Sequence, residues 1–235
     1  MTLDSDIILN GVLSLLLVTG FFIVGFSILL KYRQNKNYLF ILTGIAWIGI
    51  SEPWWPSSIS FIFALFNDTG LNTFSYVIIN NIFLPIFLLL WIIVIINLVE
   101  IQKKNLIIAL YSASAIILEL LVIYFLINDI SMVGTLLSPV DLDFGLVTTI
   151  FVVYTLVIFI VTGLIFAIKT IKIGDKDSKL RGWFLLMAFL IFLIGAIFEI
   201  VITFPINRIV ILLSAIIFYI GFIMPDAIKN LLLKS

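Results

Sequence analysis

Seven runs of mostly apolar residues cover most of this 235-residue chain, and each is about as long as a bilayer is thick. A helix that crosses the hydrocarbon core needs roughly 20 such residues. Soluble domains are about 45–50% apolar and about 25% charged, whereas this chain is 63% hydrophobic and 11% charged. The sequence therefore predicts an all-α, polytopic protein of the cell membrane, a single seven-transmembrane helix bundle in contact with the lipid bilayer. We expect the spans at residues 7–30, 38–55, 74–98, 106–127, 144–168, 183–204 and 208–224.

Basic residues lie almost entirely on one side of this predicted bundle. All of them follow the first, third, fifth or seventh span, except Arg208. An excess of Lys and Arg marks the cytoplasmic loops of membrane proteins. We therefore expect the N-terminus outside and the C-terminus in the cytoplasm. The predicted outer loops carry acidic residues instead: Asp68, Asp129, Asp141 and Asp143.

Cysteine and histidine are both absent from the chain. Their absence excludes disulfides, Ser-His-Asp and Cys-His catalysis, and the usual ligation of zinc, copper, haem or iron–sulfur clusters. We expect no metal and no cofactor. The net charge of zero indicates no attraction to nucleic acid. An intramembrane enzyme with Glu52 and Glu199 as an acid/base pair ranks last, because no nucleophile or phosphate-binding loop accompanies them.

Ionisable side chains inside spans are costly, so they mark the first candidate site. Glu52, Glu119 and Glu199 all fall in the outer third of the bilayer, at a rise of about 1.5 Å per residue. Polar and aromatic side chains share this level: Trp54, Trp55, Asn80, Asn81 and Arg208. Together these eight residues predict an outward-facing polar pocket for a small cationic or neutral ligand, with an aromatic wall for a cation. A second interpretation stays open, in which the glutamates only bond between helices and the tryptophans only anchor at the headgroups.

Prolines predict breaks in three of the spans. Pro53 and Pro56 flank Trp54 and Trp55, and Pro85 follows Asn81. Pro225 is expected to end the seventh span. The residues after it, 226–235, form a short amphipathic cytoplasmic tail, which lies along the inner leaflet or is a frayed basic end.

A loose internal repeat relates the first three spans to the last three, with the fourth span as an inverting link. Gly49 precedes Glu52 in the second span, and Gly195 precedes Glu199 in the sixth. The two spacings differ by one residue, and chance similarity explains the match equally well. A real repeat would favour a small secondary transporter with a 3+1+3 helix arrangement.

Seven spans, an outer N-terminus and a short cytoplasmic tail resemble the seven-helix sensor module found ahead of some microbial histidine kinases. The resemblance covers nearly the whole chain and consists of size, topology and outer polarity, without a diagnostic motif. It implies a receptor-like, non-enzymatic sensor that signals to a separate cytoplasmic partner, because no output domain follows the last span. The basic loop 169–181 is the expected contact for that partner. Retinal proteins share this plan, but residues 208–224 contain no lysine for a Schiff base.

Overall fold

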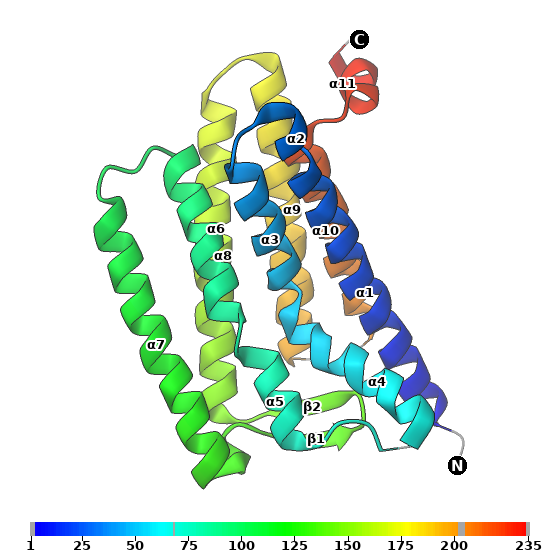
Figure 1. Cartoon of the computed structure of the whole chain (residues 1–235). Coiled ribbons are helices and arrows are strands. Elements are labelled where there is room, and N and C mark those ends of the chain that lie inside the picture. Colours follow the sequence, from blue (N-terminus) through cyan, green and yellow to red (C-terminus); the bar gives the residue numbers. More distant parts are fainter. Residues whose placement is uncertain (1–2, 68, 202–204, 234–235) are drawn as a thin grey trace.

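The chain forms a bundle of long helices that run roughly side by side, with a small β-hairpin at one end (Figure 1). This computed structural model describes residues 3–67, 69–201 and 205–233. Its elements in chain order are α1 (Ser5–Leu30), α2 (Tyr32–Asn35), α3 (Leu39–Ile50), the 3-10 turn η1 (Glu52–Trp54), α4 (Trp55–Asn67), α5 (Thr73–Asn81), α6 (Leu84–Leu98), α7 (Lys104–Asn128), η2 (Ile130–Met132), β1 (Gly134–Ser138), β2 (Asp141–Phe144), α8 (Leu146–Lys172), α9 (Lys176–Val201), α10 (Asn207–Ile223) and α11 (Asp226–Leu233).

Several of these helices are long and apolar enough to cross a membrane. Among the described residues there are five such segments. Two are end-to-end pairs, α1 with α2 and α5 with α6, and three are the single helices α7, α8 and α9. The bent pair of α10 and α11 makes a sixth if it is one span. The 12 residues of α3 and the 17 of α10 rise only about 18 and about 25 Å, against a core of about 30 Å. The structure is thus a mostly helical bundle of the membrane type, as predicted.

Both predicted breaks in the second and third spans are present. α3 ends at Ile50, the chain turns through η1, and α4 leaves at an angle to the bundle (Figure 1). The predicted second span, 38–55, is therefore a short helix and a turn, because Pro53 and Pro56 cannot donate backbone hydrogen bonds. Residues 82–83 separate α5 from α6, and Pro85 lies in the first turn of α6, where its missing N–H costs little.

The C-terminal segment is helical rather than frayed. Met224 ends α10 with φ 49°, and α11 is bent 82° away from α10. Pro225 lies at this bend, as the sequence predicted. The final residues 234–235, with the basic Lys234, lie outside the described part of the chain.

The two ends of the bundle differ in charge. We call one end the basic end; it contains α2, the α6–α7 and α8–α9 connections and α11 (Figure 1). We call the opposite end the hairpin end; it contains the N-terminus, η1, α5 and the hairpin. Every described basic residue except Arg208 belongs to the basic end. Of the predicted outer acids, Asp129, Asp141 and Asp143 lie at the hairpin end, and Asp68 lies outside the described residues.

Helix packing follows the halves of the chain. The middle helix of each half packs on both of its neighbours, α3 on α1 and α6, and α9 on α8 and α10. Where α1 crosses α3, Gly25 faces Gly44, and a Cβ built on Gly44 would lie 2.5 Å from the carbonyl oxygen of Gly25. Small residues allow such close backbone approach between membrane helices.

A cluster of large rings fills the middle of the bundle. The rings of Trp47 and Phe218 stack with centroids 3.7 Å apart, and Trp91 and Phe159 lie 5.3 Å apart. Phe189 contacts three members of this group. We refer to these five residues, which come from α3, α6, α8, α9 and α10, as the aromatic cluster.

The β-hairpin was not predicted from the sequence. β1 and β2 are antiparallel, with Gly134 opposite Phe144 and Leu136 opposite Leu142, and a register irregularity lies between Leu136 and Ser138. Gly134 and the Ser-Pro-Val-Asp stretch at 138–141 are the turn-forming residues that could have indicated it.

Candidate functional site

A cavity of about 220 Å³ lies at the hairpin end, between η1, α4, α5, the hairpin, α8, α9 and α10. Its inner wall is apolar and includes Leu88, Phe159 and Phe192. Charged groups line it from two sides, Asp141 and Asp143 from β2, and Glu199 and Arg208 from α9 and α10. The other polar residues of the wall are Ser57, Tyr76, Asn80, Thr149 and Thr155.

An ion pair between Glu199 and Arg208 forms one side of the cavity. Arg208 Nε donates to Glu199 Oε1 at 2.9 Å, and the arginine is only 3% exposed. Trp54 Nε1 donates to the same oxygen at 3.2 Å. The other carboxylate oxygen, Glu199 Oε2, is buried and has no hydrogen-bond partner among the described residues.

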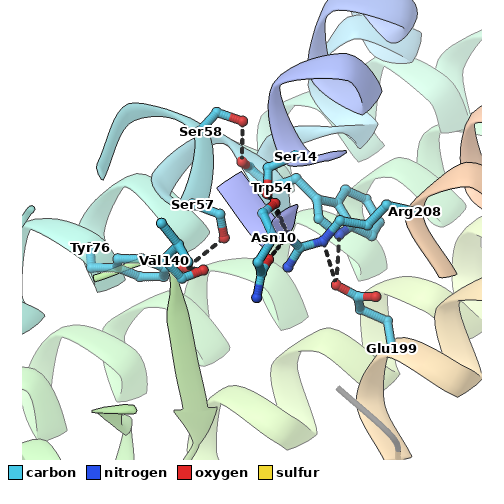
Figure 2. Close-up of polar contacts among 9 residues, drawn as sticks. All are labelled: Asn10, Ser14, Trp54, Ser57, Ser58, Tyr76, Val140, Glu199 and Arg208. Carbon is cyan, nitrogen blue, oxygen red and sulfur yellow. Dashed lines mark hydrogen bonds and ion pairs between the residues drawn. The ribbon is translucent and has the colours of Figure 1, made fainter. Parts of the chain in front are cut away.

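α1 holds the far side of the Arg208 guanidinium. Nη1 donates to the backbone oxygen of Asn10 at 2.7 Å, and also to Asn10 Oδ1 and Ser14 Oγ. Figure 2 shows the guanidinium between these two residues and Glu199. A buried charge needs such compensation, because removing water from it costs several kcal/mol. Arg208 thus joins α1, α9 and α10, and Trp54 links η1 to the same carboxylate.

Hydrogen bonds to α4 and α5 hold the hairpin over the cavity. Tyr76 OH donates to the backbone oxygen of Val140 at 3.2 Å and lies 2.6 Å from Ser57 Oγ (Figure 2). Ser60 Oγ donates to the backbone oxygen of Pro139. These contacts fix the turn just before β2, and so they place Asp141 and Asp143 in the cavity wall.

The two aspartates differ in exposure. Asp141 is half-buried, and Asp143 is exposed. Burial raises the pKa of the Asp141 carboxyl above its ordinary value, because the charged form is less well solvated there, while the charge of Arg208 acts in the opposite direction. Neither aspartate forms an ion pair within the part of the chain that the structure describes.

Four of the eight predicted site residues meet in this cavity: Trp54, Asn80, Glu199 and Arg208. Asn80 is 1% exposed, and its Oδ1 has no hydrogen-bond partner in the described ranges. Its Nδ2 lies 3.4 Å from Asn81 Oδ1. Two oxygens of residues in the wall therefore lack a partner, Asn80 Oδ1 and Glu199 Oε2. An amide oxygen and a carboxylate oxygen both accept hydrogen bonds.

Glu52 lies outside the cavity, contrary to the expectation that it lines the pocket with Glu199. It is fully buried, and its Oε1 accepts a hydrogen bond from the backbone N–H of Phe83 at 2.8 Å. The break between α5 and α6 leaves the first N–H groups of α6 without helical partners, and a carboxylate at that helix start also suits the helix dipole. The physical reason for its position is therefore the proline break itself.

Glu119, Trp55 and Asn81 also lie outside the cavity. Glu119 on α7 is half-buried and close enough to Glu52 for an electrostatic interaction. Trp55 Nε1 donates to Ser51 Oγ at 2.9 Å, so its ring turns toward α1 and α6. Asn81 Nδ2 donates to the backbone oxygen of Val77 at 2.9 Å, within its own helix. Trp55 and Asn81 are thus held by hydrogen bonds to nearby residues, whereas Glu119 Oε2 has no hydrogen-bond partner among the described residues.

Sequence reasoning missed several residues of the site. Asn10 and Ser14 are four residues apart in α1, on one helix face, and this spacing was their only signal. Asp141 and Asp143 were noted only as outer-loop charges, because their placement needs the unpredicted hairpin. Tyr76 and Ser57 come together from α5 and α4, which no local pattern indicates.

The site combines charged and polar groups with an apolar wall. It presents carboxylates, one neutralised guanidinium, unpartnered acceptors and an apolar inner wall. Within the described ranges, no three acidic side chains converge as a metal site would require. No known protein family, curated protein or solved structure matches the chain. The geometry and charge of the cavity are therefore the grounds on which a function can be proposed.

Proposed function

We propose that the protein is a receptor-like membrane protein with seven spans, which binds a small ligand from outside and signals to a separate partner. The observation that carries this proposal is the cavity at the hairpin end, where ionisable side chains from α9, α10 and β2 converge. In this proposal α3 with η1 and α4 makes the second span, and α10 the seventh. The positive-inside rule supports an orientation with the N-terminus and the cavity outside and the basic end in the cytoplasm.

Two features support communication between the ends. α9 carries Glu199 near one end and Asp177 near the other, within one uninterrupted helix. Asp177 is paired with Arg181 at 2.9 Å and with Lys229 of α11 at 3.2 Å. A shift of α9 at the cavity therefore reaches α11 and the basic loop 169–181, where we expect the partner to bind.

A small secondary transporter is the alternative, but one observation disfavours it. The aromatic cluster lies between the cavity and the basic end, and its members Trp47, Trp91, Phe189 and Phe218 are at most 1% exposed. A transported polar solute would have to pass through this packed region. The two halves of the chain do have a similar helix packing, but this similarity does not by itself imply transport.

The test uses the absence of cysteine, which makes single-cysteine labels unambiguous. Spin labels at Lys103→Cys and Lys176→Cys report the distance between the α6–α7 and α8–α9 connections in nanodiscs. We expect compounds that raise the melting temperature of the wild type to change this distance. The cavity-filling variant Ala196→Phe should abolish both effects, and the exposed Ala113→Phe should abolish neither.

Two results would contradict the proposal. Stabilising compounds that bind in the cavity and leave the distance unchanged would exclude signalling through the helices. Accumulation of such a compound inside proteoliposomes, lost in Ala196→Phe, would replace the receptor by the transporter.

A further inference from the structure

The two sides of the cavity differ in polarity. Its hairpin side carries the carboxyl groups of Asp141, Asp143 and Glu199. Its inner side carries Phe159, a member of the aromatic cluster, and Phe192, whose ring centroid lies 5.1 Å from that of Phe159. An occupant that matches both parts has a polar, charged group near the hairpin and an apolar group toward the core.

The charge balance of the cavity favours a positive occupant. Among the described residues, Arg208 is the one basic residue of the wall, and its charge is offset by Glu199 at 2.9 Å. Its Nη1 is also occupied by Asn10 and Ser14. The charges of Asp141 and Asp143 remain without an ion-pair partner among the described residues, so the wall has an acidic excess.

The unpartnered atoms give an independent indication. Asn80 Oδ1 belongs to a side chain that is 99% buried, and Glu199 Oε2 is a buried carboxylate oxygen. Both accept hydrogen bonds and cannot donate them as assigned. A buried acceptor without a partner is unfavourable, because it has lost its hydrogen bonds to water and gained none in exchange. A ligand that satisfies both atoms must therefore bring N–H or O–H donors.

We propose that the cavity binds a small organic ammonium ion with a compact apolar group, an inference that rests on the proposed function of the same cavity. The ammonium group donates to Glu199 Oε2 and Asn80 Oδ1, and its charge is offset by Asp141 and Asp143. The apolar group packs against Phe159 and Phe192. A cavity of about 220 Å³ lies below the range of about 300–1,000 Å³ that is typical of drug-sized ligands, so the occupant is small.

Aromatic residues near the acidic groups strengthen this preference. Trp54 lines the cavity with its indole N–H directed to Glu199, and Tyr76 lines it from α5. The faces of such rings attract cations. A carboxylate ligand would meet these faces and two unpaired aspartates, and would be repelled.

Three probes that share a phenethyl group and differ in charge test the inference: phenethylammonium, 2-phenylethanol and 3-phenylpropanoate. Binding is measured by calorimetry on the full chain in nanodiscs made of uncharged lipid. We expect phenethylammonium to bind at least tenfold more tightly than the alcohol, and the carboxylate more weakly than both. Asp143→Asn, a substitution at an exposed position, should reduce this charge preference severalfold, and Asp129→Asn at the same end should not.

Two cavity-filling variants locate the probe, Ala196→Phe from α9 and Val152→Phe from α8, and either suffices if the other fails to fold. Ammonium binding that persists in a folded variant overturns the inference. Equal binding of the alcohol, or tighter binding of the carboxylate, overturns the ligand class but leaves a small-molecule cavity intact. Failure of all three probes overturns the inference, while the spin-label distances decide separately on the proposed function.

Discussion

Glu52 and Glu199 occupy equivalent places in the two halves of the chain. Each lies at the hairpin end of the middle helix of its half, and each bonds to the start of the next long helix, Glu52 to the N–H of Phe83 and Glu199 to the side chain of Arg208. The glycines before them behave alike. A Cβ on Gly49 would meet Phe87 of α6, and one on Gly195 would meet Ile211 of α10.

This parallel explains why only one of the two glutamates faces the cavity. In the first half, the break before Pro85 provides a free backbone N–H, which Glu52 binds. In the second half, α10 presents Arg208 instead, and that longer side chain holds Glu199 in the cavity wall. The glutamate at this position therefore caps the start of a helix in one half and lies in the cavity wall in the other.

Removal of one member of the buried ion pair should be more harmful than removal of both. We expect Arg208→Leu to lower the free energy of unfolding by about 3–5 kcal/mol, because Glu199 is left as an uncompensated buried charge. Arg208→Leu combined with Glu199→Leu should recover much of this loss. Denaturation in mixed micelles measures the free energy of unfolding of each variant, with the exposed Arg33→Leu as control. Strictly additive effects would mean that the pair contributes no coupling.

The role of Glu52 can be separated from its charge. Glu52→Ala removes the acceptor for the Phe83 N–H, and we expect a loss of about 1–3 kcal/mol in the free energy of unfolding. Glu52→Gln keeps an oxygen acceptor, so it should retain most of the stability. Hydrogen exchange at the Phe83 amide gives the direct measurement. A glutamine variant as unstable as the alanine variant would show that the charge matters more than the acceptor.

Close approach of α1 to α3 should make Gly25→Ala destabilising. Its Cβ would lie 2.7 Å from the carbonyl oxygen of Gly44, a backbone atom that cannot move aside. Gly20→Ala in the same helix is the matched control, because its nearest neighbour is the flexible end of Leu212. We expect a lower melting temperature for Gly25→Ala only. Equal melting temperatures for both variants would show that the helices separate without penalty.

Asp141 should make stability depend on pH. Its folded pKa is raised by burial, so the folded state holds the proton more tightly than the unfolded state. The resulting stabilisation is present below the ordinary pKa of an aspartate and is lost as the pH rises through the folded value. The ionisable groups that line the same cavity are not mutated when the Asp141 variant is compared with the wild type; they are Glu199, Arg208, Asp143 and Tyr76.

The measurement is the melting temperature in detergent as a function of pH. At neutral pH we expect Asp141→Asn to melt higher than the wild type, and this gap should close as the pH falls toward 3.8, the ordinary value. Thr135→Ser, an exposed hairpin substitution without a titratable group, should follow the wild type throughout. A gap of the opposite sign would mean that the charge of Arg208 outweighs burial.

Asp177 should hold α11 against α9, but only weakly. Its partners Arg181 and Lys229 are partly exposed, and such pairs contribute about 0–1 kcal/mol. We expect Asp177→Asn to increase hydrogen exchange in α11 by up to about fivefold while the melting temperature is nearly unchanged. Glu100→Gln, at the same end, is the control. Unchanged exchange in α11 would show that its position does not depend on this carboxylate.

Local features of the fold were predictable from the sequence, and contacts between distant segments were not. The prolines at 53, 85 and 225 gave the helix breaks correctly, because their effect on the backbone acts within a few residues. That Glu199, Arg208 and Trp54 share one pocket was also expected, but not which glutamate pairs with the arginine. The hairpin, the support of Arg208 by Asn10 and the position of Glu52 depend on segments far apart in the chain, for which one sequence holds no periodic signal.

The length of α9 has one further thermodynamic consequence. It is a single helix of 26 residues, about 39 Å long, with Glu199 in the cavity wall at one end and the Asp177 pairs at the other. If a ligand changes the affinity of the basic end for a partner, linkage requires that the partner changes the affinity for the ligand by the same factor. The strength of ligand binding in a cell would then depend on the abundance of the partner, even though the two never touch.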